Sequence, residues 1–416
     1  MNKTKEWKVI THFGGFDWAQ DHHDVVIVNQ QGEIIEKWQF QHDQNGWKDF
    51  AAIVAKYPCL GIAVETSQGL MIEQMLNMEL NVYPVQPKAA KRYRERKAPS
   101  GNKNDSLDAW ALADALRMEG QHWRVLNPQD PMISELRLLC RDEVSLIEQR
   151  TALVVQLQDA LRMYYPAVLE AFDDWVQESS WAFVEAFPTP RILEKAGKRK
   201  WEKFLHVHRL WREATAQKRY AIFERAAQFC GSPSVTAAKS RLALTLVKML
   251  RLLERELKDY RHRIEELFQQ HPDRDLFGSL PGAGPKLSAR LMSEIGDDRA
   301  LYPTADNLKC YAGISPVSYQ SGQIHKVHVR RHCNKNLRHA VHLWANLSRR
   351  FCPWAQIYYQ THRQKGQSHA TAIRCLGSRW LKILWKMWQT HTPYNEALHT
   401  QNQIKHGSWI VELKAA

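Results

Sequence analysis

The sequence predicts a mixed α/β domain at the N-terminus followed by a long, mostly helical region. Residues 8–87 contain short apolar segments that alternate with turn residues and amphipathic stretches, in the order β-β-β-α-β-α-β. Two stretches, 131–163 and 236–270, repeat apolar residues at helical spacing among charged ones. Near residue 282 a glycine-rich turn opens a further amphipathic helix. The fold class is therefore α/β plus α.

Size and charge limit the possible functions. A chain of 416 residues is expected to form two or three domains. Its formal net charge of +14 indicates a polyanionic partner, and nucleic acid fits better than an anionic membrane because no basic amphipathic anchor is evident. No apolar run reaches membrane-spanning length, so no membrane association is expected. The seven cysteines are scattered without a CxxC pair, which favours the reducing cytoplasm.

The elements of the first domain follow from its patterning. Apolar and polar residues alternate in three segments that we interpret as antiparallel strands, and a fourth, continuously apolar segment is typical of a buried strand. Amphipathic helices are expected between the later strands, the second of them capped by Ser67. The predicted strands are 9–17, 24–29, 33–40, 59–66 and 81–87, and the predicted helices are 45–57 and 70–78.

The domain ends on a helix with two acidic residues in its first turn. Alanine and leucine dominate residues 105–116, and Asn104 or Asp105 can cap the start. Asp105 and Asp108 are three residues apart, so both carboxylates leave the same face of the helix. One interpretation is that they complement the helix dipole. The alternative is that they form half of a divalent-metal site.

Two further acids favour the metal site. Asp17 ends the first predicted strand and Glu65 ends the fourth, so adjacent strands would bring both to one edge of the sheet. Four converging carboxylates repel unless cations lie between them. Oxygen ligands suit Mg²⁺, with Mn²⁺ as an alternative, and a pair of such ions suits phosphodiester chemistry. Each acid also has a structural interpretation, and Asp24 and Asp114 are assigned only that one.

A basic segment lies between the last predicted strand and the acidic helix. Its sequence position beside the carboxylates suggests a loop that contacts phosphates, although a solvated loop is the alternative. The glycine and proline near residue 100 support a loop for part of it. The residues predicted to contact nucleic acid here are Lys88, Lys91, Arg92, Arg94, Arg96, Lys97 and Lys103.

The rest of the chain is predicted to be helical. Residues 131–163 and 236–270 have heptad-like patterns, which predict two long helices paired in an antiparallel coiled coil. The intervening 167–235 is interpreted as a helical insertion without an assigned role. The predicted domain limits are 1–130, 131–270 and 271–390, followed by a loosely held polar tail at 391–416.

The third region carries its own candidate nucleic-acid contacts. The turn Leu280-Pro281-Gly282-Ala283-Gly284 precedes Lys286 and resembles a helix-hairpin-helix, whose backbone N–H groups can bind a phosphate. A plain turn is the alternative. A basic stretch with Lys326, Arg330 and Arg331 comes later, and amphipathic helices are expected near 336–350 and 370–389.

Several motifs together resemble one known family. The N-terminal ones are Phe13-Gly14-Gly15-Phe16-Asp17, Val64-Glu65-Thr66 and Asn104-Asp105-Ser106-Leu107-Asp108, and the C-terminal ones are Leu280–Gly284 and Gly313-Ile314-Ser315-Pro316 with Tyr319-Gln320-Ser321-Gly322. They resemble the DEDD insertion-sequence transposases, also called bridge-RNA-guided recombinases, which are related to Piv-type DNA invertases. The resemblance implies an N-terminal RuvC-like domain of RNase H type, and a metal role for Asp17, Glu65, Asp105 and Asp108.

The resemblance also implies a mechanism and partners. A serine of the C-terminal domain, matched here by Ser321, would attack DNA and form a 5′-phosphoserine link in a composite site with the carboxylates. Ser315 and Ser318 are the neighbouring alternatives. The family works on double-stranded DNA as a dimer or tetramer and uses a structured non-coding guide RNA.

Two other functions remain open from the residues alone. The carboxylates could serve a metal-dependent nuclease that resembles Holliday-junction resolvases and forms no covalent intermediate, with Ser321 structural. The protein could also bind nucleic acid without catalysis, with the acids merely structural.

Overall fold

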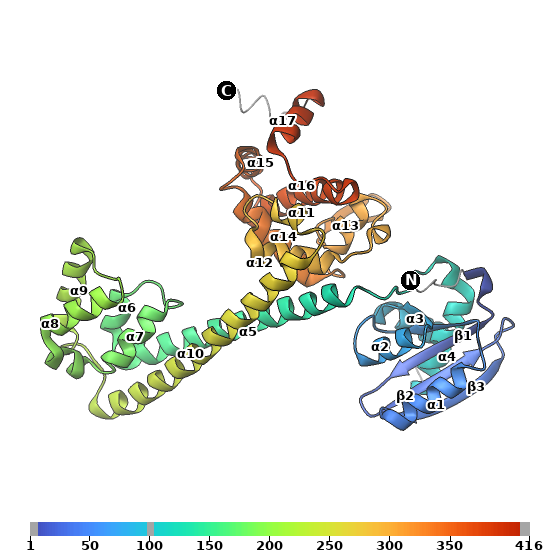
Figure 1. Ribbon diagram of the computed structural model, residues 1–416, viewed down its shortest axis with the longest axis horizontal. Coiled ribbons are helices and arrows are strands. Elements are labelled where there is room, and N and C mark those ends of the chain that lie inside the picture. Colours follow the sequence, from blue (N-terminus) through green and yellow to red (C-terminus); the bar gives the residue numbers. More distant parts are fainter. Residues whose placement is uncertain (1–6, 98–103, 408–416) are drawn as a thin grey trace. The chain divides into compact units, whose positions relative to one another are not determined.

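The computed structural model describes residues 7–97 and 104–407, and its contacts divide the chain into two compact units at Pro128 (Figure 1). The first unit contains a five-stranded sheet in the order β3-β2-β1-β4-β5. Strands β1, β2 and β3 pair antiparallel, whereas β4 and β5 run parallel to β1. The strands are β1 (His12–Trp18), β2 (His22–Val28), β3 (Ile34–Gln41), β4 (Leu60–Val64) and β5 (Asn81–Pro84).

Helices pack on both faces of this sheet. Phe16 and Ile62 face a core with α1 (Gln44–Val54) and α2 (Leu70–Asn77). Phe13 and Ala63 face a second core with α4 (Asp105–Glu119). Successive strand residues point to opposite faces, so the central strands are apolar on both sides, as predicted for β4. The five strands, α1, α2 and α4 confirm the predicted element order. The N-cap of α2 is Gly69 and not Ser67.

One helix of the first unit was not predicted. The described part of the basic segment is helix α3 (Pro87–Lys97), and the loop expected around residues 99–101 lies outside the described residues. Pro87 occupies the first helical position, where its fixed φ favours a helix, and Lys91 pairs with Glu95 one turn on at 3.5 Å. The predicted contact Lys103 lies outside the described residues.

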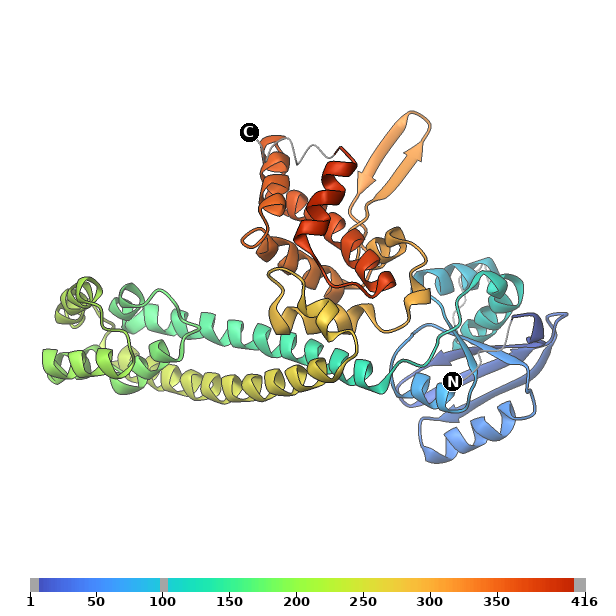
Figure 2. The same cartoon turned by 45° about the horizontal axis from the view of Figure 1, so that its top comes forward.

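Two long helices dominate the second unit. Helices α5 (Pro131–Tyr164) and α10 (Pro233–Gln270) lie side by side and antiparallel in both views, as predicted (Figures 1 and 2). Charged side chains fix their register: Glu254 of α10 accepts a hydrogen bond from Arg150 of α5 at 2.6 Å, and a second one from Arg261 of its own helix at 3.0 Å. Glu143, only 1% exposed, accepts from Arg261 and from Arg290 of helix α12 (Gly284–Ile295). These paired charges hold the two helices to each other and to the C-terminal body.

The segment between the long helices forms a small helical head at their far end. It consists of α6 (Pro166–Ala171), α7 (Glu178–Ala186), α8 (Pro190–Val207) and α9 (Glu213–Arg225). Its core is aromatic, with Trp181, Phe183 and Phe223 fully buried against the ends of α5 and α10. The segment is therefore helical, as predicted, and its interpretation as an insertion stays a prediction.

The C-terminal body is helical apart from one hairpin. Its elements are α11 (Arg274–Gly278), α12 (Gly284–Ile295), α13 (Ala305–Tyr311), β6 (Val317–Ser321), β7 (Ile324–His328), α14 (Lys335–Ser348), α15 (Pro353–Gln364), α16 (His369–Thr390) and α17 (Glu396–Lys405). In its core, Trp380 packs at a tilt against both Trp344 and Trp354, with ring centroids 4.8 and 4.7 Å away. The hairpin β6–β7 is exposed along both strands and extends away from this core (Figure 2).

Residues after 390 are not loosely held throughout, in contrast to the prediction. Tyr394 packs on Trp380, and its hydroxyl accepts a hydrogen bond from Trp354 at 3.0 Å. Asn395 caps α17 by accepting from the backbone of Leu398. Among the described residues, no helix is long and apolar enough to cross a bilayer.

Candidate metal centre

The sheet register places two of the predicted acids at neighbouring strand ends. Phe16 of β1 pairs with Val64 of β4, so Asp17 and Glu65 are the next residues on parallel strands. Both are half-buried. This arrangement follows from the apolar runs before each acid, which place the strands in the core and leave the first polar residue at the edge.

Helix α4 supplies the other two acids because its backbone packs directly on β1. A Cβ atom at Gly15 would overlap the Ala109 carbonyl oxygen and would lie 2.6 Å from the Ala113 nitrogen, so only glycine permits this approach. Asn104 caps the helix by accepting from the Leu107 N–H at 2.7 Å. Asp105 and Asp108, in the first turn, therefore lie over the strand end that carries Asp17.

The electrostatics of Asp17 show that the acids converge. Burial is the main cause of a rise in its pKa from 3.8 to about 7, and the charges of Asp108, Asp105, Glu65 and Asp24 raise it further, in that order. The other three predicted acids therefore all act on Asp17. A cation placed among them would remove this repulsion, so the donor set fits a hard divalent ion such as Mg²⁺.

A fifth acid and a histidine belong to the same cluster, and the sequence analysis missed both. Asp24 is the cross-strand partner of Asp17 in the β1–β2 hairpin, although it was assigned a structural role only. His22 Nε2 lies 3.8 Å from Asp24 Oδ2 and 3.7 Å from Asp105 Oδ2. The ligand atoms of these three residues lie within 4.8 Å of one another, which suits a metal ion. The β1–β2 hairpin turns between residues 20 and 21, so Asp24 stands opposite Asp17. This pairing is the sequence signal that predicts Asp24.

Asp108 is held by an arginine that was predicted to contact nucleic acid. Arg94 Nη1 of α3 donates to both carboxylate oxygens of Asp108 at 3.0 Å, and the two side chains are 19% and 9% exposed. A cation that uses Asp108 would therefore share the carboxylate with this guanidinium group or compete with it. By contrast, Asp114 pairs with Arg117 at 2.6 Å, in line with its assigned structural role.

Four other predicted contacts of α3, namely Lys88, Lys91, Arg92 and Arg96, are exposed. Lys88 and Arg92 point to solvent, and Arg96 lies 4.0 Å from Glu119. Their exposure leaves the helix surface basic beside the acidic cluster.

The second unit holds the other predicted residues. Gly282 and Gly284 both have positive φ in the turn before α12, which a side chain would strain. Gly282 packs against the end of α14, whereas Gly284 and Lys286 are exposed. The turn therefore combines a packing glycine with an open helix start.

Ser321 ends β6, next to the two-residue turn at Gly322, and is exposed. Gly322 has a φ of 56°, which suits the first position of a type II′ hairpin turn. The carboxylates and Ser321 belong to different units of the chain. Lys326 of β7 and Arg331 are exposed, and Arg330 Nε donates to the Ser315 carbonyl at 3.3 Å.

Comparison with known proteins identifies the family. Residues 14–166 match a transposase family model of DEDD, IS110 type, and residues 274–360 match the transposase IS116/IS110/IS902 family. The chain is 31% identical over 400 residues to the mini-circle putative transposase for IS117 of Streptomyces coelicolor, which covers 93% of this chain and 96% of that protein. It is 26% identical over 377 residues to an uncharacterized 44.8 kDa protein of insertion element IS116 from Streptomyces clavuligerus, covering 90% and 93%. The chain therefore belongs to the IS116/IS110/IS902 family of insertion-element transposases.

Proposed function

We propose that this protein cuts and rejoins the DNA of its own mobile element by metal-dependent phosphoryl transfer. The observation that supports the proposal is the position of Asp17 and Glu65 at neighbouring strand ends, together with the effect of the Asp105 and Asp108 charges on the pKa of Asp17. Asp24 and His22 extend the same donor set. A bound Mg²⁺ ion would supply charge stabilisation for the phosphate and would lower the pKa of an attacking hydroxyl group.

In this proposal, different residues bind the cation, position Asp108 and bind DNA. The carboxylates of β1, β4 and α4 hold the cation, and Arg94 holds Asp108 in place when the cation is absent. The exposed cations of α3 bind the DNA backbone next to the cleaved phosphate.

Ser321 is the nucleophile in the proposed reaction. Its Oγ attacks the phosphorus and loses its proton to solvent, the bond from phosphorus to the 3′ oxygen breaks, and that oxygen takes up a proton from solvent, which leaves a 5′-phosphoserine and a free 3′-hydroxyl group. Exposure at the tip of a hairpin and the motif match support this assignment. A weakly nucleophilic serine requires activation, which the metal-bound acidic cluster would provide when the two units meet around DNA.

The proposed partners are double-stranded DNA, a structured guide RNA and further copies of the chain. The net charge of +14 supports a polyanionic partner, and the motif resemblance supports the RNA and a dimer or tetramer. The RuvC-like classification of the first unit is part of the same proposal, supported by the order of its elements.

A cleavage and trapping assay on element-end DNA tests the proposal. Asp105→Asn and Asp108→Asn are expected to abolish cleavage, because each removes a ligand charge. Ser321→Ala is expected to abolish the covalent protein–DNA adduct seen after denaturation, whereas Ser318→Ala on the same strand retains it. Cleavage by S321A without an adduct would instead indicate a nuclease that uses water.

A further inference from the structure

The helical head has a basic surface to which no function has been assigned (Figure 1). Residues 191–219, which span α8, the following turn and the start of α9, contain ten lysines and arginines against three glutamates. None of the exposed cations between residues 191 and 212 forms an ion pair with another described residue, so the chain does not neutralise their charges. An excess of this size attracts a polyanion.

Three basic side chains share one face of α8. The helix is interrupted at Gly197, whose φ is 72°, and is regular beyond that residue. Arg199, Lys203 and His206 follow at spacings of four and three residues, and all three are exposed. They lie on the side of the helix opposite Trp201, which is buried in the core of the head. The stripe therefore faces solvent.

The turn after α8 folds a tryptophan back onto this stripe. The Leu210 N–H donates to the Leu205 carbonyl at 2.8 Å, and the Arg209 N–H donates to the His206 carbonyl at 3.0 Å. This pair of hydrogen bonds defines a Schellman turn, and Arg209 holds its left-handed position with a φ of 55°, where glycine is usual. Trp211 consequently stacks on His206, with ring centroids 4.8 Å apart and 18° between the ring planes.

Trp211 lies outside the aromatic core of the head. It is 38% exposed, and Trp18 is the only other exposed tryptophan among the described residues. Arg219 fixes the turn by donating to the Leu210 carbonyl at 2.7 Å, and the exposed Arg212 follows the ring directly. A fixed, exposed aromatic ring among cations is typical of surfaces that stack nucleotide bases and bind their phosphates.

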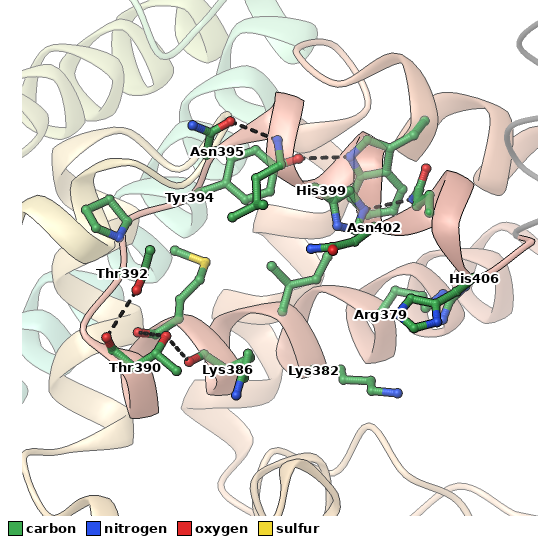
Figure 3. Close-up of a pocket in the computed structure, with 16 residues that line it drawn as sticks. Arg379, Lys382, Lys386, Thr390, Thr392, Tyr394, Asn395, His399, Asn402 and His406 are labelled. Carbon is green, nitrogen blue, oxygen red and sulfur yellow. Dashed lines mark hydrogen bonds between the residues drawn. The ribbon is translucent and has the colours of Figure 1, made fainter.

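The basic surface of the C-terminal body lacks such a ring. Lys382 and Lys386 project from α16 beside a cavity of about 790 Å³ (Figure 3). Tyr394 of this cavity packs on Trp380, and its hydroxyl accepts from Trp354. None of the tryptophan or tyrosine residues that line the cavity is exposed. This second surface offers charge for a phosphate but no exposed tryptophan or tyrosine ring for a base.

We propose that the helical head binds an unpaired nucleotide of single-stranded RNA. The base stacks on Trp211, and the neighbouring phosphates pair with Arg199 and Lys203. Duplex DNA keeps its bases paired and stacked, whereas loops of RNA expose theirs, so RNA fits this surface better than the DNA substrate does. The proposal rests on the proposed function only in requiring an RNA partner.

Photochemical crosslinking of the full-length chain tests the contact with the base. The probe is a single-stranded RNA that contains iodouridine, which crosslinks to a stacked aromatic side chain on irradiation. We expect mass spectrometry to identify a crosslinked peptide that contains Trp211. Trp211→Leu should remove this crosslink, whereas Trp211→Phe should retain it, because a phenyl ring still stacks. Absence of the crosslink from the wild-type protein would overturn the proposal.

Variants of the stripe test the contacts with phosphates. The dependence of crosslink yield on RNA concentration gives the affinity at Trp211 itself, separately from other sites of the chain. Arg199→Gln and Lys203→Gln should each weaken this affinity and reduce the slope of log affinity against log salt by about 0.7. Both side chains are exposed, so these variants test the site even if W211L fails to fold. Lys382→Gln, on the second basic surface, is the matched control and should change neither quantity.

Other occupants give different results. A higher crosslink yield at Trp211 with single-stranded DNA of the same sequence, or with duplex DNA, would overturn the assignment to RNA. If R199Q and K203Q change the oligomeric state in light scattering but not the crosslink, the surface is a contact between chains and the proposal is wrong.

The variant D105N keeps this proposal separate from the proposed function. It should lose cleavage of element-end DNA and keep the crosslink at Trp211, because the carboxylates lie in the other unit of the chain. Cleavage that survives in D105N refutes the metal centre alone. Asp105-dependent cleavage without a crosslink at Trp211 refutes the RNA site alone.

Discussion

At the scale of single residues, Asp17 links the sequence to the proposed chemistry. The charges of the other acids all act on its carboxyl group. The pKa of this group is raised to about 7, mainly by burial. The position of Asp17 was predictable, because an apolar strand ends there. Asp24 and His22 were not predicted because their roles depend on cross-strand register, and the pairing of Arg94 depends on an unpredicted helix.

Replacing Asp17 by asparagine should stabilise the metal-free protein at high pH. Because the folded state raises the pKa of Asp17, it binds the proton more tightly than the unfolded chain, and stability falls as pH rises from about 4 to about 7. Partial exposure screens the effect to on the order of 1–2 kcal/mol. We therefore expect a higher melting temperature for D17N at pH 8 with a chelator, but not near pH 4.

Added Mg²⁺ should give the wild-type protein the higher melting temperature, because the ion stabilises the wild type and not D17N. Asp49→Asn, on the exposed face of α1, is the control for a lost carboxylate. A wild-type melting temperature that does not change with pH between 4 and 8 would refute the electrostatic account.

Replacing Arg94 should strengthen metal binding. The guanidinium group occupies both oxygens of Asp108, so a cation competes with it for this ligand. In R94Q we expect Mn²⁺ to bind on the order of tenfold more tightly, equivalent to about 1.4 kcal/mol, by calorimetry or paramagnetic resonance. Arg92→Gln, exposed on the same helix, should leave the affinity unchanged. Equal affinities of R94Q and the wild type would show that Arg94 and the cation do not compete for Asp108.

At the scale of elements, the close packing of α4 on β1 decides whether the site forms. The glycine pair before Asp17 was visible in the sequence, and so was the alanine-rich helix, but their contact arises only in the folded sheet. Helices α3 and α15 were missed because charges and aromatic residues obscure their periodicity. The hairpin β6–β7 was missed because its strands are short and exposed, without a buried face.

Substituting Gly15 by alanine tests this packing. The added methyl group meets the backbone of α4, which cannot move aside as a side chain could, so we expect a loss of stability of about 3 kcal/mol or more and weaker metal binding. Gly278→Ala is the matched control, since its methyl group would meet nothing within 4 Å. Chemical denaturation of both variants gives the comparison, and a G15A protein as stable as G278A would contradict the close approach.

At the scale of the whole molecule, the carboxylates and Ser321 lie in separate units joined near Pro128. The family motifs identify the carboxylates and Ser321 in the sequence. No local sequence pattern indicates whether the reacting groups come from one chain or from two. Most elements and most of the acids could therefore be predicted from the sequence, whereas the arrangement of units and chains could not.

Mixing two inactive variants should restore activity if sites assemble between chains. D105N supplies an intact serine and S321A supplies intact carboxylates, so a mixed dimer contains one complete site. Random pairing leaves roughly a quarter of the sites complete. DNA strand cleavage by the mixture, compared with each variant alone, measures this fraction. Activity no higher than that of the single variants would contradict assembly in trans in freely exchanging dimers.

The lengths of the two long helices also set the distance between the helical head and the C-terminal body. Thirty-eight residues in α10 correspond to about 57 Å at 1.5 Å per residue, and the charge pairs of Glu143 and Glu254 prevent the helices from sliding. The helical head is thus held at a fixed distance from the C-terminal body. Removing two turns from both helices would bring the head closer by about 11 Å, the rise of roughly three base pairs of DNA. The number of residues in α5 and α10 consequently determines the spacing of any DNA or RNA features that the head and the body contact.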